Sequence, residues 1–315
     1  MYQRFFGLRE SPFNVNPDPR YLFMTQQIQE ALAGLTYGIQ NRKGFILLTG
    51  EVGTGKTTLL NRLLDWLHGQ NVSTAYIFNS RLEVDHLFDF MMAEFEIPCK
   101  SRDKSQVLMR LNQWLLDRYR AGETAVLIVD EAQNLTPEVL EEIRLLTNLE
   151  TSTEKLLQIV LTGQPELEEK LKLPELRQLR QRITLRCRTA ALSLEETFGY
   201  IAERLRIAGA SGEPIFSKEA IQTVHTYSRG IPRVVNLLCE HALIGSYVDG
   251  VHPVPAHVVE EVAREFQLDE IAPIAPARLA SANRGLDTQS LLSNLDELLG
   301  RLRQVNALAS RERKS

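Results

Sequence analysis

Cysteine is scarce in this chain of 315 residues. Its three cysteines, Cys99, Cys187 and Cys239, lie far apart in the sequence and form no CxxC pair. The six histidines show no HExxH or similar spacing. These absences argue against a disulfide framework and against a zinc site, so we interpret each cysteine as a small buried hydrophobic residue.

Long apolar runs are also missing. The longest, such as Phe45–Leu48 and Ala125–Val129, have the length of strands and are far too short to span a membrane. The first residues contain neither the apolar core nor the cleavage site of a signal peptide. We therefore expect a cytoplasmic protein without direct membrane insertion, whose contact with the inner membrane would run through a partner.

Neither sign of charge is in large excess. The chain has 36 lysines and arginines against 40 aspartates and glutamates, a formal net charge of -4. The whole-protein charge therefore gives no reason to expect nucleic-acid binding, although it leaves room for a local basic patch.

Short apolar runs alternate with helical patterns through the first 190 residues. We expect five strands, at Phe45–Thr49, Val72–Phe78, Ala125–Val129, Leu156–Thr162 and Ile183–Cys187. Helical periodicity lies between them, at Thr58–His68, Leu82–Phe95, Lys104–Arg120 and Pro137–Leu149. Strands separated by helices predict an α/β fold with a five-stranded parallel sheet covered on both faces. We assign residues 1–190 to this nucleotide-binding domain.

Only helical patterns follow Ser193. Ser193–Glu196 is a capping box, and further helices are expected from Ser217, over Pro232–Val248 and over Pro255–Phe266. We assign residues 191–268 to a small all-helical lid domain.

The composition changes again after the lid. Residues 269–285 contain a run of prolines and alanines typical of a linker. Residues 286–315 carry leucines on one helical stripe and end in basic residues. We expect an amphipathic C-terminal helix that packs against a partner, or a tail without fixed structure.

A phosphate-binding motif follows the first strand. Residues 50–57 fit GxxxxGK[ST] and lie between an expected strand and an expected helix, the context that this motif requires. Backbone N–H groups of such a loop and the helix start bind phosphate, the lysine reaches the β/γ oxygens, and the threonine hydroxyl ligates Mg²⁺. The expected cofactors are ATP and Mg²⁺, and the expected binding residues are Gly50, Glu51, Val52, Gly53, Thr54, Gly55, Lys56, Thr57 and Thr58.

Two acids end the third expected strand. Asp130 and Glu131 follow the apolar run Ala125–Val129 and would therefore lie at the carboxyl edge of the sheet, beside the phosphate loop. We expect Asp130 to hold Mg²⁺ with Thr57, and Glu131 to orient and deprotonate the attacking water.

Further polar residues stand where a nucleotide's γ-phosphate would be. Thr162 or Gln164, at the end of the fourth strand, would contact this region. Arg180 or Arg182, before the last strand, could be supplied to a neighbouring subunit's nucleotide as a transition-state arginine. Arg233 stands at a helix start, an unfavourable place for a cation, and could reach the γ-phosphate across the cleft.

Several strings of the sequence resemble, in order and spacing, the ExeA-like (general secretion pathway protein A type) AAA+ ATPases. They are Phe5–Phe13, Pro17–Tyr21, Glu30–Leu32, Tyr37–Ile39, Asp130–Leu135, Leu161–Leu167 and Leu179–Ile183. The resemblance implies the same roles for the residues above, with Thr162 or Gln164 as sensor 1, Arg180 or Arg182 as trans finger and Arg233 as sensor 2. It also implies that the segment around Phe13–Tyr21 packs near the adenine.

The long relatives in that family carry a transmembrane segment and a peptidoglycan-binding domain after the lid, and this sequence shows neither. We therefore expect a short form, a homo-oligomer such as a ring, that uses ATP to drive assembly of, or export through, a bacterial secretion, pilus or exopolysaccharide machine. The same core also resembles transposition regulators of the TnsC and MuB type. An ATP-dependent DNA-binding filament is therefore the alternative hypothesis, which the basic stretch Arg177–Arg188 keeps open.

Overall fold

The computed structural model describes residues 1–14, 16–78, 82–98 and 103–268. All of these described residues belong to one compact unit. The linker expected at 269–285 and the helix or tail expected at 286–315 lie outside the described residues. None of the helices within the described ranges is long and apolar enough to cross a membrane.

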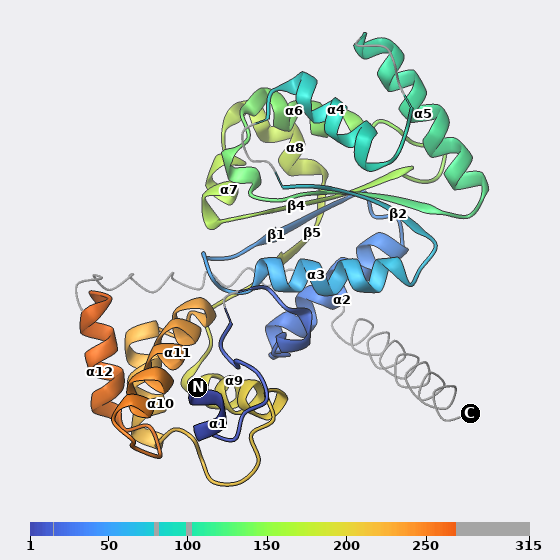
Figure 1. Ribbon diagram of the computed structural model, residues 1–315. Coiled ribbons are helices and arrows are strands. Elements are labelled where there is room, and N and C mark those ends of the chain that lie inside the picture. The colour runs from blue at the N-terminus through green and yellow to red at the C-terminus, as the bar shows by residue number, and fades with distance from the viewer. Residues whose placement is uncertain (15, 79–81, 99–102, 269–315) are drawn as a thin grey trace, which may run out of the picture. The chain divides into compact units, whose positions relative to one another are not determined.

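The predicted five-stranded parallel sheet is confirmed (Figure 1). Its strands are β1 (Phe45–Thr49), β2 (Val72–Ile77), β3 (Thr124–Val129), β4 (Leu157–Gly163) and β5 (Ile183–Arg188), and their order is β2-β3-β4-β1-β5. The sequence places the phosphate loop after β1, the two acids after β3 and the polar pair at the end of β4. Because β4 pairs with both β1 and β3, these three groups meet at one edge of the sheet.

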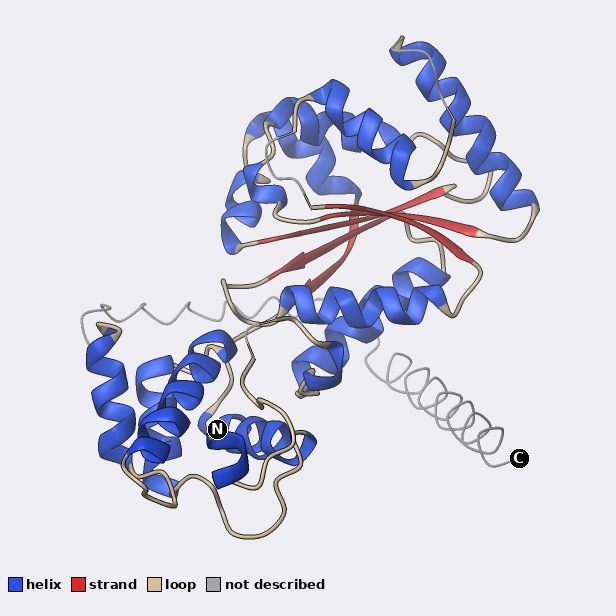
Figure 2. Ribbon diagram, in the orientation of Figure 1, coloured by secondary structure: helices blue, strands red, loops and turns tan. Residues whose placement is uncertain are grey.

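Helices cover both faces of the sheet (Figure 2). Buried residues of α2 (Gln26–Gln40) and α3 (Lys56–His68) pack with Ile46 and Leu48 on one face. Phe45 and Leu47 point to the other face, as the two-residue period of a strand requires. The second face is covered by α4 (Val84–Glu94), α5 (Lys104–Arg120), α6 (Pro137–Leu146), α7 (Pro165–Lys170) and α8 (Arg177–Arg182).

Two features of this layer differ from expectation. Helix α2, which begins at the N-cap Thr25, was not predicted as a helix, although its residues Ile28 and Leu35 are buried. Strand β5, which we expected to be buried, is an edge strand whose alternate residues Thr184, Arg186 and Arg188 are exposed. Only one face of β5 is covered, and its polar residues occupy the other.

The regular elements described after β5 are helices, as predicted, with one isolated bridge between Phe216 and Val254. They form α9 (Leu194–Ile207), α10 (Lys218–Ser228), α11 (Pro232–Val248) and α12 (Ala256–Glu265) around a hydrophobic core of their own. The capping box is confirmed: the Glu196 N–H donates to Ser193 Oγ, and the Ser193 N–H donates to a Glu196 carboxylate oxygen. Short helices elsewhere are α1 (Tyr2–Phe5), η1 (Pro19–Tyr21), η2 (Ala132–Asn134) and η3 (Pro174–Leu176).

The N-terminal segment packs with these helices rather than with the sheet. Phe6, Leu8 and Phe13, which we grouped with the α/β domain, are buried in the helical core. Large apolar side chains are stabilised wherever they leave water, and the helical core offers that place. The chain therefore crosses from the helical cluster to the sheet before α2, and both parts border the site described next.

Candidate functional site

The loop of residues 50–57 joins β1 to α3, and α3 begins at Lys56. Lys56 is 7% exposed, and its Nζ donates to the carbonyl oxygens of Gly50 at 2.7 Å and Glu51 at 3.0 Å. Burial lowers the pKa of Lys56, and the nearby carboxylates of Glu131 and Asp130 counter part of this effect. The lysine is thus held at a helix start with acidic groups close by.

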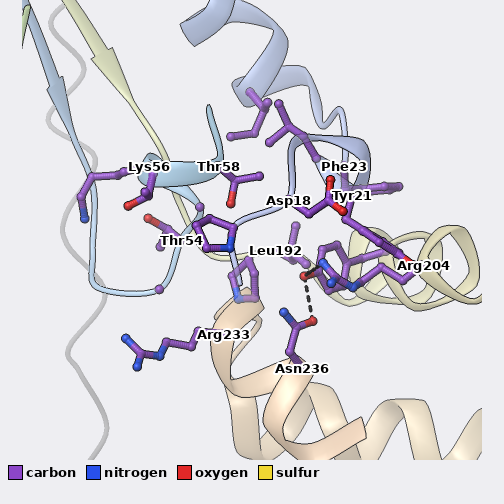
Figure 3. Close-up of a pocket in the computed structure, with 18 of the residues that line it drawn as sticks. Asp18, Tyr21, Phe23, Thr54, Lys56, Thr58, Leu192, Arg204, Arg233 and Asn236 are labelled. Atoms are coloured by element: carbon purple, nitrogen blue, oxygen red, sulfur yellow. Dashed lines mark hydrogen bonds between the residues drawn. The ribbon is translucent and has the colours of Figure 1, made fainter. Parts of the chain in front are cut away.

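The predicted phosphate-binding residues divide into two sets. Val52, Gly53, Thr54, Gly55, Lys56, Thr57 and Thr58 line a cavity, which Figure 3 shows with Lys56 and Thr58 labelled. Gly50 and Glu51 are not among the described lining residues and instead hold the Lys56 ammonium through their carbonyls. The Thr54 hydroxyl bonds Thr189 Oγ1 at 2.6 Å, so it braces the loop against the segment after β5.

Asp130 and Glu131 directly follow the carboxyl end of β3. Asp130 is 6% exposed, and its Oδ1 accepts from the Thr162 hydroxyl at 3.2 Å and from the Glu131 N–H at 2.9 Å. Its Oδ2 accepts from the Tyr76 hydroxyl at 2.9 Å, and burial together with this carboxylate raises the pKa of Tyr76. Sequence reasoning missed Tyr76, which has no motif and reaches Asp130 only because β2 and β3 are neighbours.

Glu131 lines the cavity, and its carboxylate has polar partners of its own. Its Oε2 accepts from Gln164 Nε2 at 3.3 Å and from Gln133 Nε2 at 2.6 Å. The two polar residues predicted at the end of β4 therefore serve different acids, Thr162 contacting Asp130 and Gln164 contacting Glu131. Neither of them is among the described residues that line the cavity.

The oxygen groups here are ligands of a kind that Mg²⁺ takes. Within the described ranges, no group of three or more His, Cys, Asp or Glu side chains could hold a metal ion. Mg²⁺ needs no such cage, because it keeps waters and takes one or two protein oxygens together with phosphate oxygens. The Asp130 carboxylate and the Thr57 hydroxyl are donors of that kind.

The helical cluster supplies the opposite wall of the cavity. Arg233 lies in the first turn of α11, its N–H donates to Gly53 O at 3.1 Å, and its side chain lines the cavity (Figure 3). Gly53 makes this approach possible, because its φ is +80° and a Cβ there would lie 2.7 Å from Arg233 Cβ. Arg233 therefore lies beside Gly53 of the phosphate loop, and its contact with a γ-phosphate stays a prediction.

The cavity extends from the loop to the N-terminal segment and measures about 340 Å³, within the range of small-molecule sites. Asn14, Asn16, Asp18 and Tyr21 line this far end, whereas Phe13 is buried in the helical core. Of the segment that the resemblance assigned to this region, the part after Phe13 borders the cavity.

A buried arginine that the sequence did not reveal organises the far end. Arg204 of α9 donates from Nε to Pro12 O at 2.6 Å and from Nη1 to the Tyr200 hydroxyl at 3.0 Å. Its guanidinium lies 4.4 Å from the centre of the Tyr21 ring. The Tyr200 hydroxyl donates in turn to Asn236 Oδ1 at 2.8 Å, the bond drawn in Figure 3. Helical spacing alone marks Arg204 as just another charged residue of α9.

Replacing Arg204 by alanine is expected to destabilise the fold. The change leaves the Pro12 carbonyl without its donor and removes the stacking on Tyr21, which together should cost about 2 to 3 kcal/mol. The thermal midpoint, followed by circular dichroism, should fall by roughly 5 °C or more. Arg206→Ala is the matched control, because Arg206 is exposed on the same helix and pairs only with Glu203. Equal midpoints for both variants would contradict this role.

The two candidate trans arginines lie away from the cavity. Neither Arg180 nor Arg182 is among its described lining residues. Arg182 is partly buried, and its Nη1 donates to Thr147 Oγ1 within the same chain. Arg180 is exposed on α8. Of the pair, Arg180 is the one that a second chain could meet.

Fold and site together define a P-loop nucleotide-binding protein with an AAA-type core. A family model described as AAA domain matches residues 39–171. Over 255 aligned residues the chain is 48% identical to general secretion pathway protein A of Aeromonas hydrophila. The aligned region covers 81% of this chain and 46% of that protein. The resemblance seen in the sequence is thereby confirmed: this chain carries an AAA domain of the ExeA-like type, and it spans about half the length of that relative.

Solved structures support the fold alone. The Aeropyrum pernix ORC2 protein, in ADPNP–ADP complexes, matches with a TM-score of 0.62 at 16% identity over 84% of this chain and 75% of that one. A structure of Drosophila ORC bound to DNA matches with a TM-score of 0.64 at 19% identity, over 84% and 66%. CDC6P from Pyrobaculum aerophilum matches with a TM-score of 0.60 at 19% identity, over 76% of this chain and 66% of that one.

Proposed function

We propose that this chain binds Mg²⁺–ATP and hydrolyses it to ADP and phosphate. The observation that carries the proposal is the meeting of three groups at one cavity. The loop with Lys56 at its helix start, the acids Asp130 and Glu131, and Arg233 from the helical cluster all border or adjoin it. Phosphoryl transfer needs little beyond such positioning and neutralisation of charge.

Each residue has a distinct role in this proposal. Amides of residues 50–55 and the start of α3 hold the phosphates, with Thr58 alongside, and Lys56 leaves its carbonyl partners for the β/γ oxygens. Thr57 and Asp130 hold Mg²⁺, which neutralises charge on those oxygens when bound. Glu131 takes the proton of the attacking water. Thr162 and Gln164 fix the two acids, and Arg233 senses the γ-phosphate.

We further infer that the protein acts as an oligomer in a bacterial envelope system. The similarity to general secretion pathway protein A favours a partner protein from a secretion, pilus or export machine, reached from the cytoplasmic side. An oligomer is favoured by the exposed Arg180, which is not among the described residues lining the cavity of its own chain and could serve a neighbour's.

ATP-dependent DNA binding is the second candidate. It is supported by the exposure of Arg177, Arg180 and Arg186 in α8 and β5, which could contact phosphates despite the negative net charge of the chain.

Steady-state ATP hydrolysis, measured over a range of protein concentrations, tests both candidates. We expect turnover that requires Mg²⁺, is abolished by a chelator and rises per subunit with protein concentration. Double-stranded DNA should leave the rate unchanged. Stimulation by DNA would favour the second candidate, and an absence of hydrolysis under all these conditions would refute the enzyme.

A further inference from the structure

Gln133 makes the shortest hydrogen bond to the Glu131 carboxylate. Its Nε2 donates to Oε2 at 2.6 Å, and the longer bond from Gln164 Nε2 reaches the same oxygen at 3.3 Å. No described residue donates a hydrogen bond to the other oxygen, Oε1. One carboxylate oxygen of Glu131, a residue that lines the cavity, is therefore fixed by two amide donors, and the other accepts from no described donor.

The amide of Gln133 is itself fixed at both ends. Its Oε1 accepts from the Gln164 N–H at 3.1 Å, which settles which side of the amide carries the donor. The backbone of η2 is held by Lys170, whose Nζ donates to Gln133 O and Leu135 O at 2.6 Å each. A Cβ on Gly163 would lie 2.6 Å from Gln133 Oε1, so the end of β4 leaves room for this side chain only because residue 163 is glycine.

Glu131 also has an unusual backbone. Its φ is +51° and its ψ is +37°, a left-handed conformation that a residue with a Cβ adopts at a cost of about 1 kcal/mol or more. Such strain persists only where the surroundings determine it. Here the turn at Glu131 brings the Gln133 side chain to the Glu131 carboxylate, where the two form the 2.6 Å hydrogen bond.

We propose that Gln133 is a positioning residue that orients the Glu131 carboxylate, fixing Oε2 so that Oε1 accepts the proton of the attacking water. This inference rests on the proposed ATP hydrolysis. Gln133 is not among the described residues that line the cavity, so its replacement should affect the chemical step and spare nucleotide binding. Gln164 assists, but its longer bond makes it the lesser of the two.

Gln133→Met tests the proposal, because methionine keeps the length of the side chain and removes both the donor and the acceptor. We expect kcat for ATP hydrolysis to fall about 10- to 100-fold, as small displacements of catalytic groups do, while the Kd of a fluorescent ATP analogue changes less than about threefold. Gln164→Met should lower kcat less. Gln113→Met is the matched control: Gln113 is exposed on α5, its Nε2 donates to Asp117 at 3.0 Å, and it is not among the described residues that line the cavity.

A double variant separates positioning from general damage. In the Glu131→Gln background, adding Gln133→Met should lower the single-turnover rate no further, because the group that Gln133 orients is no longer a base. Three results would overturn the inference: an unchanged kcat in Gln133→Met, a raised kcat, or parallel losses of kcat and affinity. If the wild-type protein itself fails to hydrolyse ATP, the proposed function fails instead, which is a separate outcome.

Discussion

Lys56→Ala should lose measurable ATP binding, whereas Glu131→Gln should bind ATP and lose hydrolysis by about 10²- to 10⁴-fold. Lys56 is the cation that α3 places at the phosphate loop, and its carbonyl partners Gly50 and Glu51 offer no substitute charge. The amide of a glutamine can occupy the place of Glu131 but cannot accept the water's proton. Titration with a fluorescent ATP analogue and single-turnover hydrolysis measure the two effects separately.

The exposed pair Lys172 and Glu169 provides matched controls for these changes. Lys172→Ala and Glu169→Gln alter charge in the same way on the surface, and both should behave like the wild-type protein. If Lys56→Ala and Glu131→Gln lose ATP binding to the same extent, the division of roles is wrong. Glu131 would then contribute to holding the nucleotide rather than to activating water.

The sequence predicted the site best where the signal is local. A glycine-rich loop between a strand and a helix leaves few alternatives, and β1 has the bounds expected for it, Phe45–Thr49. The acids Asp130 and Glu131 follow five consecutive apolar residues, Ala125–Val129, so their place at the carboxyl end of the strand follows from the parallel topology. The helix Pro232–Val248 was also predicted to the residue, because Gly230 and Pro232 punctuate its start.

Contacts between segments that are far apart in the chain could not be predicted from the sequence. Arg204 and Pro12 are 192 residues apart, and nothing in the helical spacing of α9 distinguishes Arg204 from its exposed neighbour Arg206. Tyr76 bonds Asp130 only because β2 lies beside β3. Tyr76 and Gln133 were therefore missed as partners of the acids, whereas the acids themselves and their partners Thr162 and Gln164 stand among the predicted residues.

Loss of Arg180 should reduce ATP turnover about 10³-fold or more while ATP binding persists, since arginine fingers contribute roughly 10³- to 10⁵-fold in phosphoryl transfer. Arg180 is exposed. Arg182, the other candidate for the trans arginine, donates a hydrogen bond to Thr147 Oγ1 in its own chain. Arg182→Ala should therefore act mainly by loosening the contact between α8 and α6. Arg177→Ala is the control and should retain full turnover, because Arg177 is also exposed and lies three residues before Arg180 on the same helix.

Mixing variants tests whether this arginine acts in trans. Arg180→Ala protein has an intact Glu131, and Glu131→Gln protein has an intact Arg180, so an interface between them can unite one working copy of each. We expect partial recovery of hydrolysis on mixing, together with wild-type specific activity that climbs with protein concentration. A rate per subunit that stays constant on dilution, with no recovery on mixing, would mean that a single chain completes its own site. The exposed arginines of α8 and β5 would then be a solvated basic surface, and DNA or another acidic partner would be the next ligand to test against them.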